Sequence, residues 1–275
     1  MFEFLRARLR LGRSATTPIP PDPSVLPERF RGRPVLQRSD GASCDELTTN
    51  DRECLAGAPS SFVRIGERGL PVLDLGSCLF APEEAVDCGQ SQVVFTRDYR
   101  MAARTRDALV TTDGEVTLAH ALDKRARRLF GRSLRLRSVA AGSCGGCEAE
   151  LVALGNVVFD MARFGVQFVA SPRHADGIVV TGAVSVNMRV ALEKAYEAVP
   201  DPRLVIAVGA CAIAGGPFRE SPEVLGGLPP SIPVDLWIPG CPPHPLTVLD
   251  GILRLLGRLE DGERQMPNAA IVATG

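Results

Sequence analysis

The chain has 275 residues, 45% of them apolar and 23% charged, which is the balance of an ordinary folded protein with one large or two modest domains. A formal net charge of -1 and 5% aromatic residues give no reason to expect a nucleic-acid partner. No stretch approaches the ~18 consecutive apolar residues that cross a bilayer. The N-terminus lacks a signal-peptide core and a twin-arginine pair, so we expect a cytoplasmic protein. Eight cysteines in that compartment favour metal or redox chemistry over a disulfide framework.

Residues 1–30 read as a basic N-terminal segment followed by a Pro-rich linker. Phe2 and Leu9 lie on one predicted helical stripe with arginines beside it, and the proline-rich run 17–27 cannot continue a helix. Two interpretations stay open for residues 1–13: a helix packed on a partner subunit, or an amphipathic helix in contact with the membrane surface.

Residues 31–130 show little periodicity and many turn-forming residues. Their only clear helical pattern covers residues 117–130 and has a basic end. Four of the cysteines lie in this region, Cys44, Cys54, Cys78 and Cys88.

Residues 131–262 alternate between strand and helix patterns, and residues 263–275 read as a tail. The predicted strands are 134–139, 166–170, 177–181, 204–208 and 234–238. The predicted helices are one with Leu151, Leu154, Val158 and Met161 on one face, then 186–199 and 246–259. Such alternation predicts an α/β fold with a mostly parallel sheet and helices on both faces.

Four cysteines follow strands of this predicted sheet. Cys144 and Cys147 lie in the glycine-rich loop after the first strand, while Cys211 and Cys241 follow the fourth and fifth strands. Loops that leave the carboxyl ends of parallel strands share one edge, where ligands bind, so topology alone brings these thiols together. Nearby glycines let the backbone approach a bulky inorganic group and point amides at it.

The sequence therefore predicts one iron–sulfur cluster on these four cysteines. A structural zinc site and buried unligated cysteines stay open as alternatives. Zinc sites usually draw on paired Cys-x-x-Cys knuckles, and only one such pair is present among the four.

Five motifs, in order, resemble one family. They are Gly-Ser-Cys144-Gly-Gly-Cys147-Glu148, Ser-Pro-Arg-His174-Ala-Asp176, Thr181-Gly-Ala-Val184, Gly209-Ala-Cys211-Ala-Ile-Ala-Gly-Gly216 and Pro239-Gly-Cys241-Pro-Pro243. The family is the small (20 kDa-type) electron-transfer subunit shared by complex I and the membrane-bound [NiFe] hydrogenases, and the pattern looks closest to the formate hydrogenlyase small subunit. Complex I proteins carry two adjacent cysteines at the first position, so the spacing from Cys144 to Cys147 is more similar to the hydrogenase branch.

The resemblance implies a flavodoxin-like fold and one [4Fe-4S] cluster at an interface with a hydrogenase-like large subunit. It also implies a chain that passes single electrons, is not catalytic alone, and sits with membrane subunits at the cytoplasmic face of the inner membrane. A complex I-like quinone-reducing subunit and an assembly subunit without hydrogenase activity stay open as alternatives. Glu148 follows a ligand and is a candidate proton-route residue, although acids are also favoured in a first helical turn.

Residues 27–100 are similar to the two-cluster ferredoxin subunit of the same complexes. The similarity rests on Pro27-Glu-Arg-Phe-Arg-Gly-Arg-Pro34, Leu73-Asp-Leu-Gly-Ser-Cys78-Leu-Phe80 and Phe95-Thr-Arg-Asp-Tyr99. Such a ferredoxin needs two Cys-x₂-Cys-x₂-Cys-x₃-Cys-Pro runs, and the last cysteine of each run ligates the other cluster. Here the first run reads Thr48, Asp51, Cys54 and Ala58, and the second reads Cys78, Ala81, Glu84 and Cys88.

Neither ligand set is complete. One would keep Cys54 and Cys88, with Asp51 as a conceivable oxygen ligand, and the other would keep only Cys78. Cys44 lies outside the register. We therefore expect residues 31–130 to form a smaller, degenerate ferredoxin-like α+β domain that binds no cluster.

Overall fold

The computed structural model describes residues 21–38, 48–57, 62–66, 69, 71–89, 91–112 and 116–259. The basic segment 1–13, Cys44 and the tail 263–275 lie outside these residues, so the expectations for them stay predictions.

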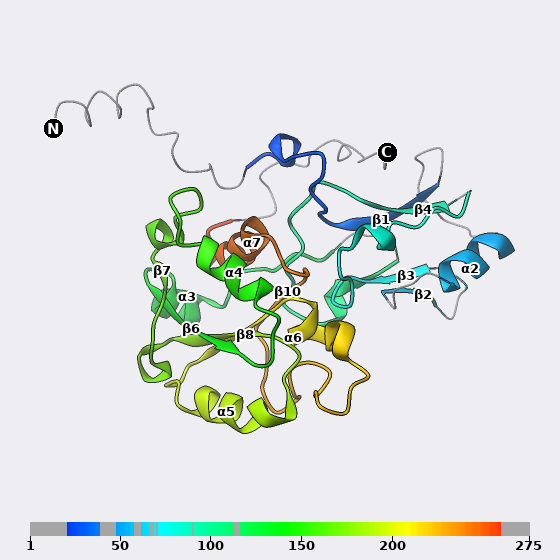
Figure 1. Ribbon diagram of the computed structural model, residues 1–275. Helices are drawn as coiled ribbons and strands as arrows, with labels where there is room; N and C mark the ends of the chain where they lie inside the picture. The colour runs from blue at the N-terminus through cyan, green and yellow to red at the C-terminus, as the bar shows by residue number, and fades with distance from the viewer. Residues whose placement is uncertain are drawn as a thin grey trace.

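A five-stranded parallel sheet organises the C-terminal part of the chain (Figure 1). Its strands are β6 (Leu134–Ala140), β7 (Val166–Phe168), β8 (Gly177–Thr181), β9 (Leu204–Val208) and β10 (Leu236–Ile238), in the order β10-β9-β8-β6-β7. Counted along the chain, this is the 2-1-3-4-5 arrangement of flavodoxin-like folds. The predicted fold class is confirmed, and the strand order reverses between β6 and β8, where such folds bind their ligands.

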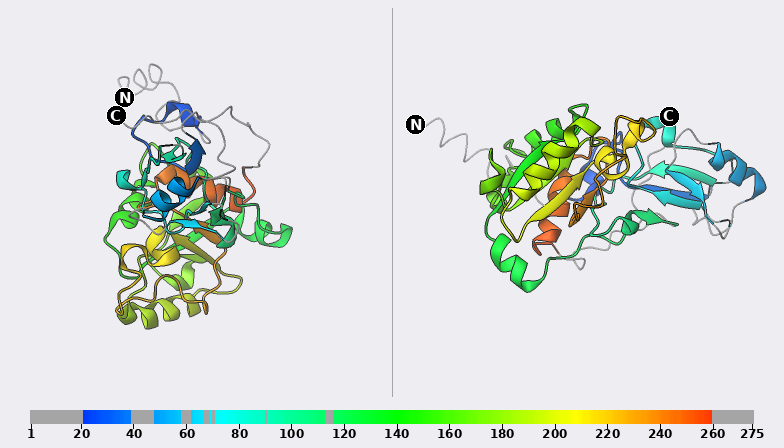
Figure 2. Two further views of the ribbon diagram at one scale, coloured as in Figure 1. Left: turned by 90° about the vertical axis from the view of Figure 1, so that its right-hand side faces the viewer. Right: turned by 90° about the horizontal axis from the view of Figure 1, so that it is seen from below.

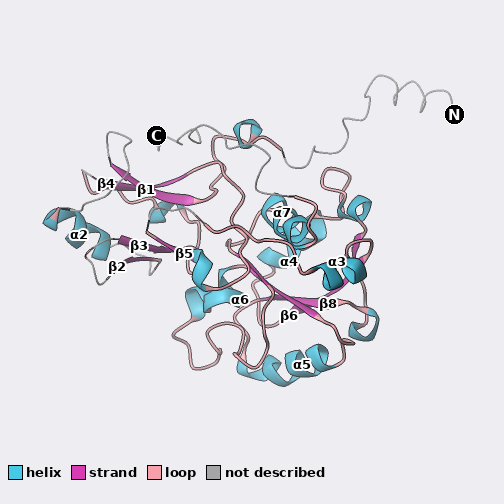
Figure 3. Ribbon diagram, turned by 180° about the vertical axis from the view of Figure 1, so that it is seen from behind, coloured by secondary structure: helices cyan, strands magenta, loops and turns pink. Residues whose placement is uncertain are grey.

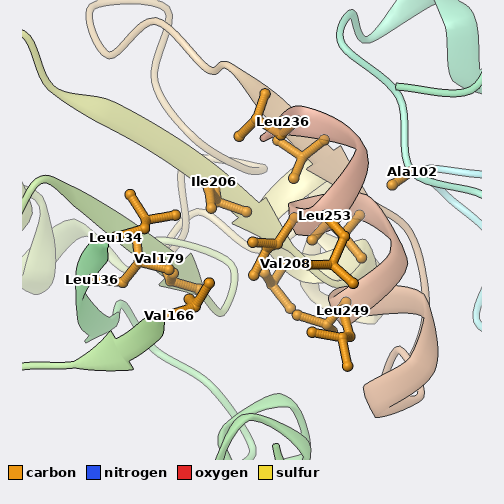
Figure 4. Packing of buried hydrophobic residues seen from close by; sticks show 14 of the residues in the cluster. Ala102, Leu134, Leu136, Val166, Val179, Ile206, Val208, Leu236, Leu249 and Leu253 are labelled. Atoms are coloured by element: carbon orange, nitrogen blue, oxygen red, sulfur yellow. The ribbon is translucent and has the colours of Figure 1, made fainter. Parts of the chain in front are cut away.

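Two apolar layers enclose the sheet, because successive strand residues point to opposite faces. The helices α4 (Gly146–Ala153) and α7 (Pro245–Leu255) cover one face, and α5 (Val186–Glu197) covers the other (Figures 1 and 3). On β8, Val179 packs in the same apolar layer as Leu249 of α7. Figure 4 shows some of the residues of this layer. The neighbouring Val180 packs with Leu192 of α5.

The residues ahead of β6 build two small antiparallel sheets, which stand beside the parallel sheet (Figure 2). One sheet pairs β1 (Pro34–Arg38) with β4 (Ser91–Phe95); the other has β2 (Val63–Ile65), β3 (Pro71–Asp74) and β5 (Val110–Thr111), with α2 (Thr49–Ala56) against β2. A shared apolar cluster joins this N-terminal unit to the parallel sheet, since Cys78 and Phe80 pack with Ala212 and Ile213 of α6 (Ala210–Ala214).

Short helical segments complete the described chain. They are α3 (Lys124–Phe130) and the 3-10 turns η1 (Pro23–Val25), η2 (Pro82–Glu84), η3 (Asp107–Leu109), η4 (Met161–Phe164), η5 (Pro172–His174) and η6 (Gly216–Phe218). Within the described residues, no helix has both the length and the apolar character needed to span a membrane.

The helix predicted over residues 117–130 is wrong in its first half. Only α3 forms, and it begins after Asp123, whose carboxylate accepts a hydrogen bond from the Ala126 amide at 2.8 Å. Backbone amides before α3 donate hydrogen bonds to segments distant in the sequence. The Ala119 amide donates to the Ala102 carbonyl, and the Leu122 amide donates to the Leu255 carbonyl. Docking onto neighbouring segments therefore replaces the local helical bonds.

The continuous helical face predicted from Leu151 to Met161 is also interrupted. The helix α4 ends at Ala153, and the Asn156 side chain then accepts hydrogen bonds from the Val158 and Phe159 amides. Asparagine readily forms such turns with the backbone that follows it, which ends the helix.

Candidate iron–sulfur centre

The four predicted ligands lie in the loops that leave β6, β9 and β10 at one edge of the sheet. Cys144 is exposed just ahead of α4, and Cys147 is buried as the second residue of that helix. Cys211 is the second residue of α6, and Cys241 follows β10; both are partly exposed.

The thiols at this edge raise one another's pKa values, in addition to the effect of burial. Burial raises the pKa of Cys147 to about 12, with further contributions from Cys211, Cys241, Glu148 and Cys144. Burial likewise raises the pKa of Cys211 to about 11, again with help from Cys241 and Cys144. For Cys241 burial is the main cause of a raised pKa, followed by Cys144. Such thiols can ionise together only beside a strong positive centre, and metal-bound thiols lose their protons outright.

Glycine backbone makes room for the ligands. A Cβ atom on Gly209 would lie 2.6 Å from the Cys147 sulfur, and one on Gly216 would lie 2.6 Å from the Cys211 sulfur. Both glycines have positive φ values, 90° and 55°. No larger residue could occupy either position without displacing a thiol, so the residues present fit a bulky group bound by closely approached thiolates.

Within the part of the chain that the structure describes, no three Cys, His, Asp or Glu side chains converge tightly enough to hold a single metal ion. A [4Fe-4S] cluster makes a different demand, because it is a larger body held by four thiolates.

Glu148 ties two of the loops together across the strand-order reversal. Its carboxylate accepts a hydrogen bond from the Ser143 hydroxyl at 2.6 Å and another from the hydroxyl of Thr181, the last residue of β8. Burial opposes ionisation, but these two hydrogen bonds outweigh it and hold the pKa of Glu148 below its usual range. Since a proton relay works best with a pKa near the operating pH, the geometry favours a loop-bridging role. A proton-route role for Glu148 stays a prediction.

Sequence reasoning missed this bridge. The signal was available in part, because Thr181 ends a predicted strand of the same sheet and Glu148 lies beside the neighbouring glycine-rich loop. The rotamers that join them depend on the loop conformation.

A cavity of about 230 Å³ lies beside Cys241 at the boundary of the two units. Phe80 and Met101 line it from the N-terminal unit, and Glu150 and His244 line it from the other side. His244 accepts a hydrogen bond from the Leu246 amide at 3.2 Å through Nδ1 and thereby caps α7.

Two cysteines of the predicted ferredoxin register are linked in the N-terminal unit. Cys54 and Cys88, which that register assigns to one cluster, are joined in a disulfide with a Cα–Cα distance of 5.8 Å. They are the only linked cysteines among the described residues. Asp51 is buried and forms a capping box with Thr48 at the start of α2, so its carboxylate already serves the helix.

The fold defines a flavodoxin-like α/β protein with four cysteines at the carboxyl edge of its parallel sheet. Residues 144–255 match the family described as NADH ubiquinone oxidoreductase, 20 Kd subunit, and the chain belongs to that family. Iron–sulfur binding is typical of its members.

Relatives come from both hydrogenases and quinone oxidoreductases. The probable membrane-bound hydrogenase subunit mbhJ of Pyrococcus furiosus is 44% identical over 141 residues, which are 50% of this chain and 84% of that protein. Formate hydrogenlyase subunit 7 of Escherichia coli is 45% identical over 129 residues, 47% of this chain and only 51% of that protein. An NADH-quinone oxidoreductase subunit of Heliobacterium modesticaldum is 45% identical over 116 residues, 42% of this chain and 66% of that protein.

Among solved structures, a chain of an archaeal membrane-bound sulfane sulfur reductase is similar at 34% identity with a TM-score of 0.44. The similarity covers 52% of this chain and 78% of that one.

Proposed function

We propose that the chain is an electron-transfer subunit of a membrane-attached, hydrogenase-like complex of the formate hydrogenlyase type, with one [4Fe-4S] cluster on Cys144, Cys147, Cys211 and Cys241. The observation that carries the proposal is that the loops after β6, β9 and β10 bring these four free cysteines to one edge of the sheet. A bound cluster would accept and release single electrons. The chain itself supplies ligation, burial and backbone amides, and makes or breaks no substrate bonds.

Exposed side chains near this edge support docking of a large subunit. Cys144 is exposed there. Val186, the first residue of α5, is 47% exposed, and Phe218, which follows the Cys211 loop, is 49% exposed. A partner that covers this edge would bury the cluster between the two chains.

Other parts of the proposal concern the rest of the chain. Residues 31–130 are proposed to be a ferredoxin-like domain that binds no cluster and is kept for docking or for its shape. The complex is proposed to sit at the cytoplasmic face of the inner membrane, with residues 1–13 in contact with a partner or with lipid.

A quinone-reducing subunit is the second candidate, because the relatives named as NADH-quinone oxidoreductase subunits are as similar as the hydrogenase relatives. The Cys144-x-x-Cys147 spacing favours the hydrogenase branch. The large subunit that co-purifies with the chain would distinguish the two, since paired Cys-x-x-Cys motifs in that subunit indicate a nickel site.

The test is anaerobic purification followed by iron, sulfide and zinc analysis and low-temperature EPR after dithionite reduction. We expect about four irons and four sulfides per chain and one reduced-cluster signal. The signal should disappear in Cys211→Ala and persist in Cys78→Ala, the matched control that removes a free cysteine outside the proposed ligand set.

Other results would redirect the proposal. Eight or more irons per chain would mean that the ferredoxin-like region still binds metal. Stoichiometric zinc would indicate a structural site, and folded protein without iron would favour an assembly subunit.

A further inference from the structure

The second degenerate ligand run closes around a buried carboxylate. Glu84, which aligns with the third cysteine of that run, is 3% exposed. Its Oε2 atom accepts hydrogen bonds from the Leu79 amide at 2.9 Å, the Ala81 amide at 3.2 Å and the Cys78 thiol at 3.3 Å. All three donors belong to the loop that a ferredoxin would wrap around its cluster. In a ferredoxin, loop amides of this kind would donate hydrogen bonds to the cluster sulfides. Here the Glu84 carboxylate accepts those hydrogen bonds instead.

The loop holds a conformation that a bulky residue seldom adopts. Phe80 has a φ of 54°, in the left-handed region, and its amide points at the Cys78 sulfur, 3.4 Å away. Such backbone persists only where its surroundings fix it. Here Arg31 donates a hydrogen bond to the Phe80 carbonyl, and the Glu84 carboxylate accepts one from the Leu79 amide.

This loop lies against the proposed cluster site. Phe80 and Cys241 line the same cavity, and Cys78 packs in one apolar cluster with Ala212, the residue after Cys211. Glu84 binds the amides on either side of Phe80, so its carboxylate lies directly behind the part of the cavity wall that faces Cys241.

We propose that Glu84 is a positioning residue that stands in for a lost ferredoxin cluster and lowers the reduction potential of the remaining cluster through its fixed negative charge. The inference rests on the proposed function, because it requires a cluster on the four cysteines. Reduction adds a negative charge to the cluster, and a buried carboxylate nearby makes that addition less favourable. A glutamate that only held the turn would leave the potential unchanged.

The test is the Glu84→Gln variant of the full chain, with the midpoint potential measured by EPR-monitored redox titration. Glutamine keeps a carbonyl acceptor for the loop amides but removes the charge. We expect the reduction equilibrium to shift about tenfold toward the reduced cluster, equivalent to about +59 mV for one electron. Glu84→Asp should stay near the wild-type value, since it keeps the charge. Glu83→Gln, in the same 3-10 turn but exposed, should cause no shift.

The iron content separates two kinds of failure. About four irons per chain with equal potentials in Glu84→Gln and Glu83→Gln would overturn the role of Glu84 and leave the proposed function intact. Wild-type protein without a cluster would overturn both. If Glu84→Gln folds poorly, the double variant Cys78→Ala/Glu84→Gln removes the thiol donor, while the glutamine carbonyl can still accept hydrogen bonds from the Leu79 and Ala81 amides. Its potential must then lie above that of Cys78→Ala for the inference to stand.

Discussion

Replacing Gly209 with alanine should prevent cluster binding by displacing one ligand. Gly209 precedes α6 with φ 90° and ψ 156°, a region of backbone conformation that is essentially restricted to glycine. The new Cβ atom would lie 2.6 Å from the Cys147 sulfur and 3.4 Å from the Gly240 carbonyl oxygen. Because Cys147 is only 9% exposed, its side chain cannot simply turn into solvent.

The cost has two parts. Forcing alanine into this backbone conformation costs about 1–3 kcal/mol. Carbon and sulfur atoms in contact sit ~3.5–4 Å apart, so the overlap is about 1 Å and adds about 1–3 kcal/mol of overpacking. The sum of about 2–6 kcal/mol is a large part of the ~5–15 kcal/mol that stabilises a typical domain.

The assay combines chemical denaturation with iron analysis of protein purified without oxygen. Gly226→Ala is the matched control, because Gly226 also has a positive φ (72°) but a Cβ atom there would meet only the Arg219 carbonyl oxygen, at 4.0 Å. The control should lose about 1–2 kcal/mol from strain alone and keep its full iron content. The reasoning would be refuted if Gly209→Ala retained as much iron and stability as the control.

Two further predictions concern the N-terminal unit. The double variant Cys54→Ala/Cys88→Ala should be less stable than the oxidised wild type by about 4 kcal/mol, from the loop entropy of a 34-residue separation, as measured by denaturation with and without reductant. Equal stability of the oxidised and reduced wild type would contradict this. Asp74→Asn should cost about 1–3 kcal/mol at pH 7, since the buried Asp74 carboxylate accepts bonds from Arg106 and Ser77, both at 2.7 Å. Burial opposes ionisation of Asp74, but the hydrogen bond and charge of Arg106 outweigh burial and lower the pKa of this carboxyl in the folded protein. The ionised carboxylate therefore stabilises the fold fully above the unfolded-state pKa of 3.8. This stabilisation is lost as the pH falls through the lower pKa of the folded state. A stability gap that stays constant between pH 7 and strongly acidic pH, in urea titrations, would contradict this interpretation.

The strands of the parallel sheet could be predicted because strands buried on both faces are continuous apolar runs. Residues 177–181 and 204–208 are β8 and β9 to the residue. The helix over 117–130 could not be placed correctly, because its apolar residues are buried by docking. Leu122, for instance, pairs with the Leu255 carbonyl at the end of α7, a contact that no local pattern encodes.

The shared edge of the cysteines was also predictable, since it follows from strand order alone. The contacts around Glu84 and Glu148 were not, because each depends on the exact course of a loop. Phe80 shows the reason: its left-handed φ turns the flanking Leu79 and Ala81 amides toward Glu84, and no sequence rule assigns that conformation to a phenylalanine.

The disulfide joins two positions that the predicted ferredoxin register assigns to one cluster. In a two-cluster ferredoxin, the third cysteine of the first run and the fourth cysteine of the second run bind the same cluster. The register places Cys54 and Cys88 at those two positions, and the structure joins them although 34 positions separate them. A wrong register would give no reason for this pairing. Our prediction is that the N-terminal unit keeps the chain path of a ferredoxin without its ligand sets, with a disulfide at one predicted ligand set and the Glu84 carboxylate at the other. The shared core gives a reason to keep such a path. Cys78 and Phe80 pack on α6, which carries Cys211, so unfolding of the N-terminal unit would expose a wall of the proposed cluster site.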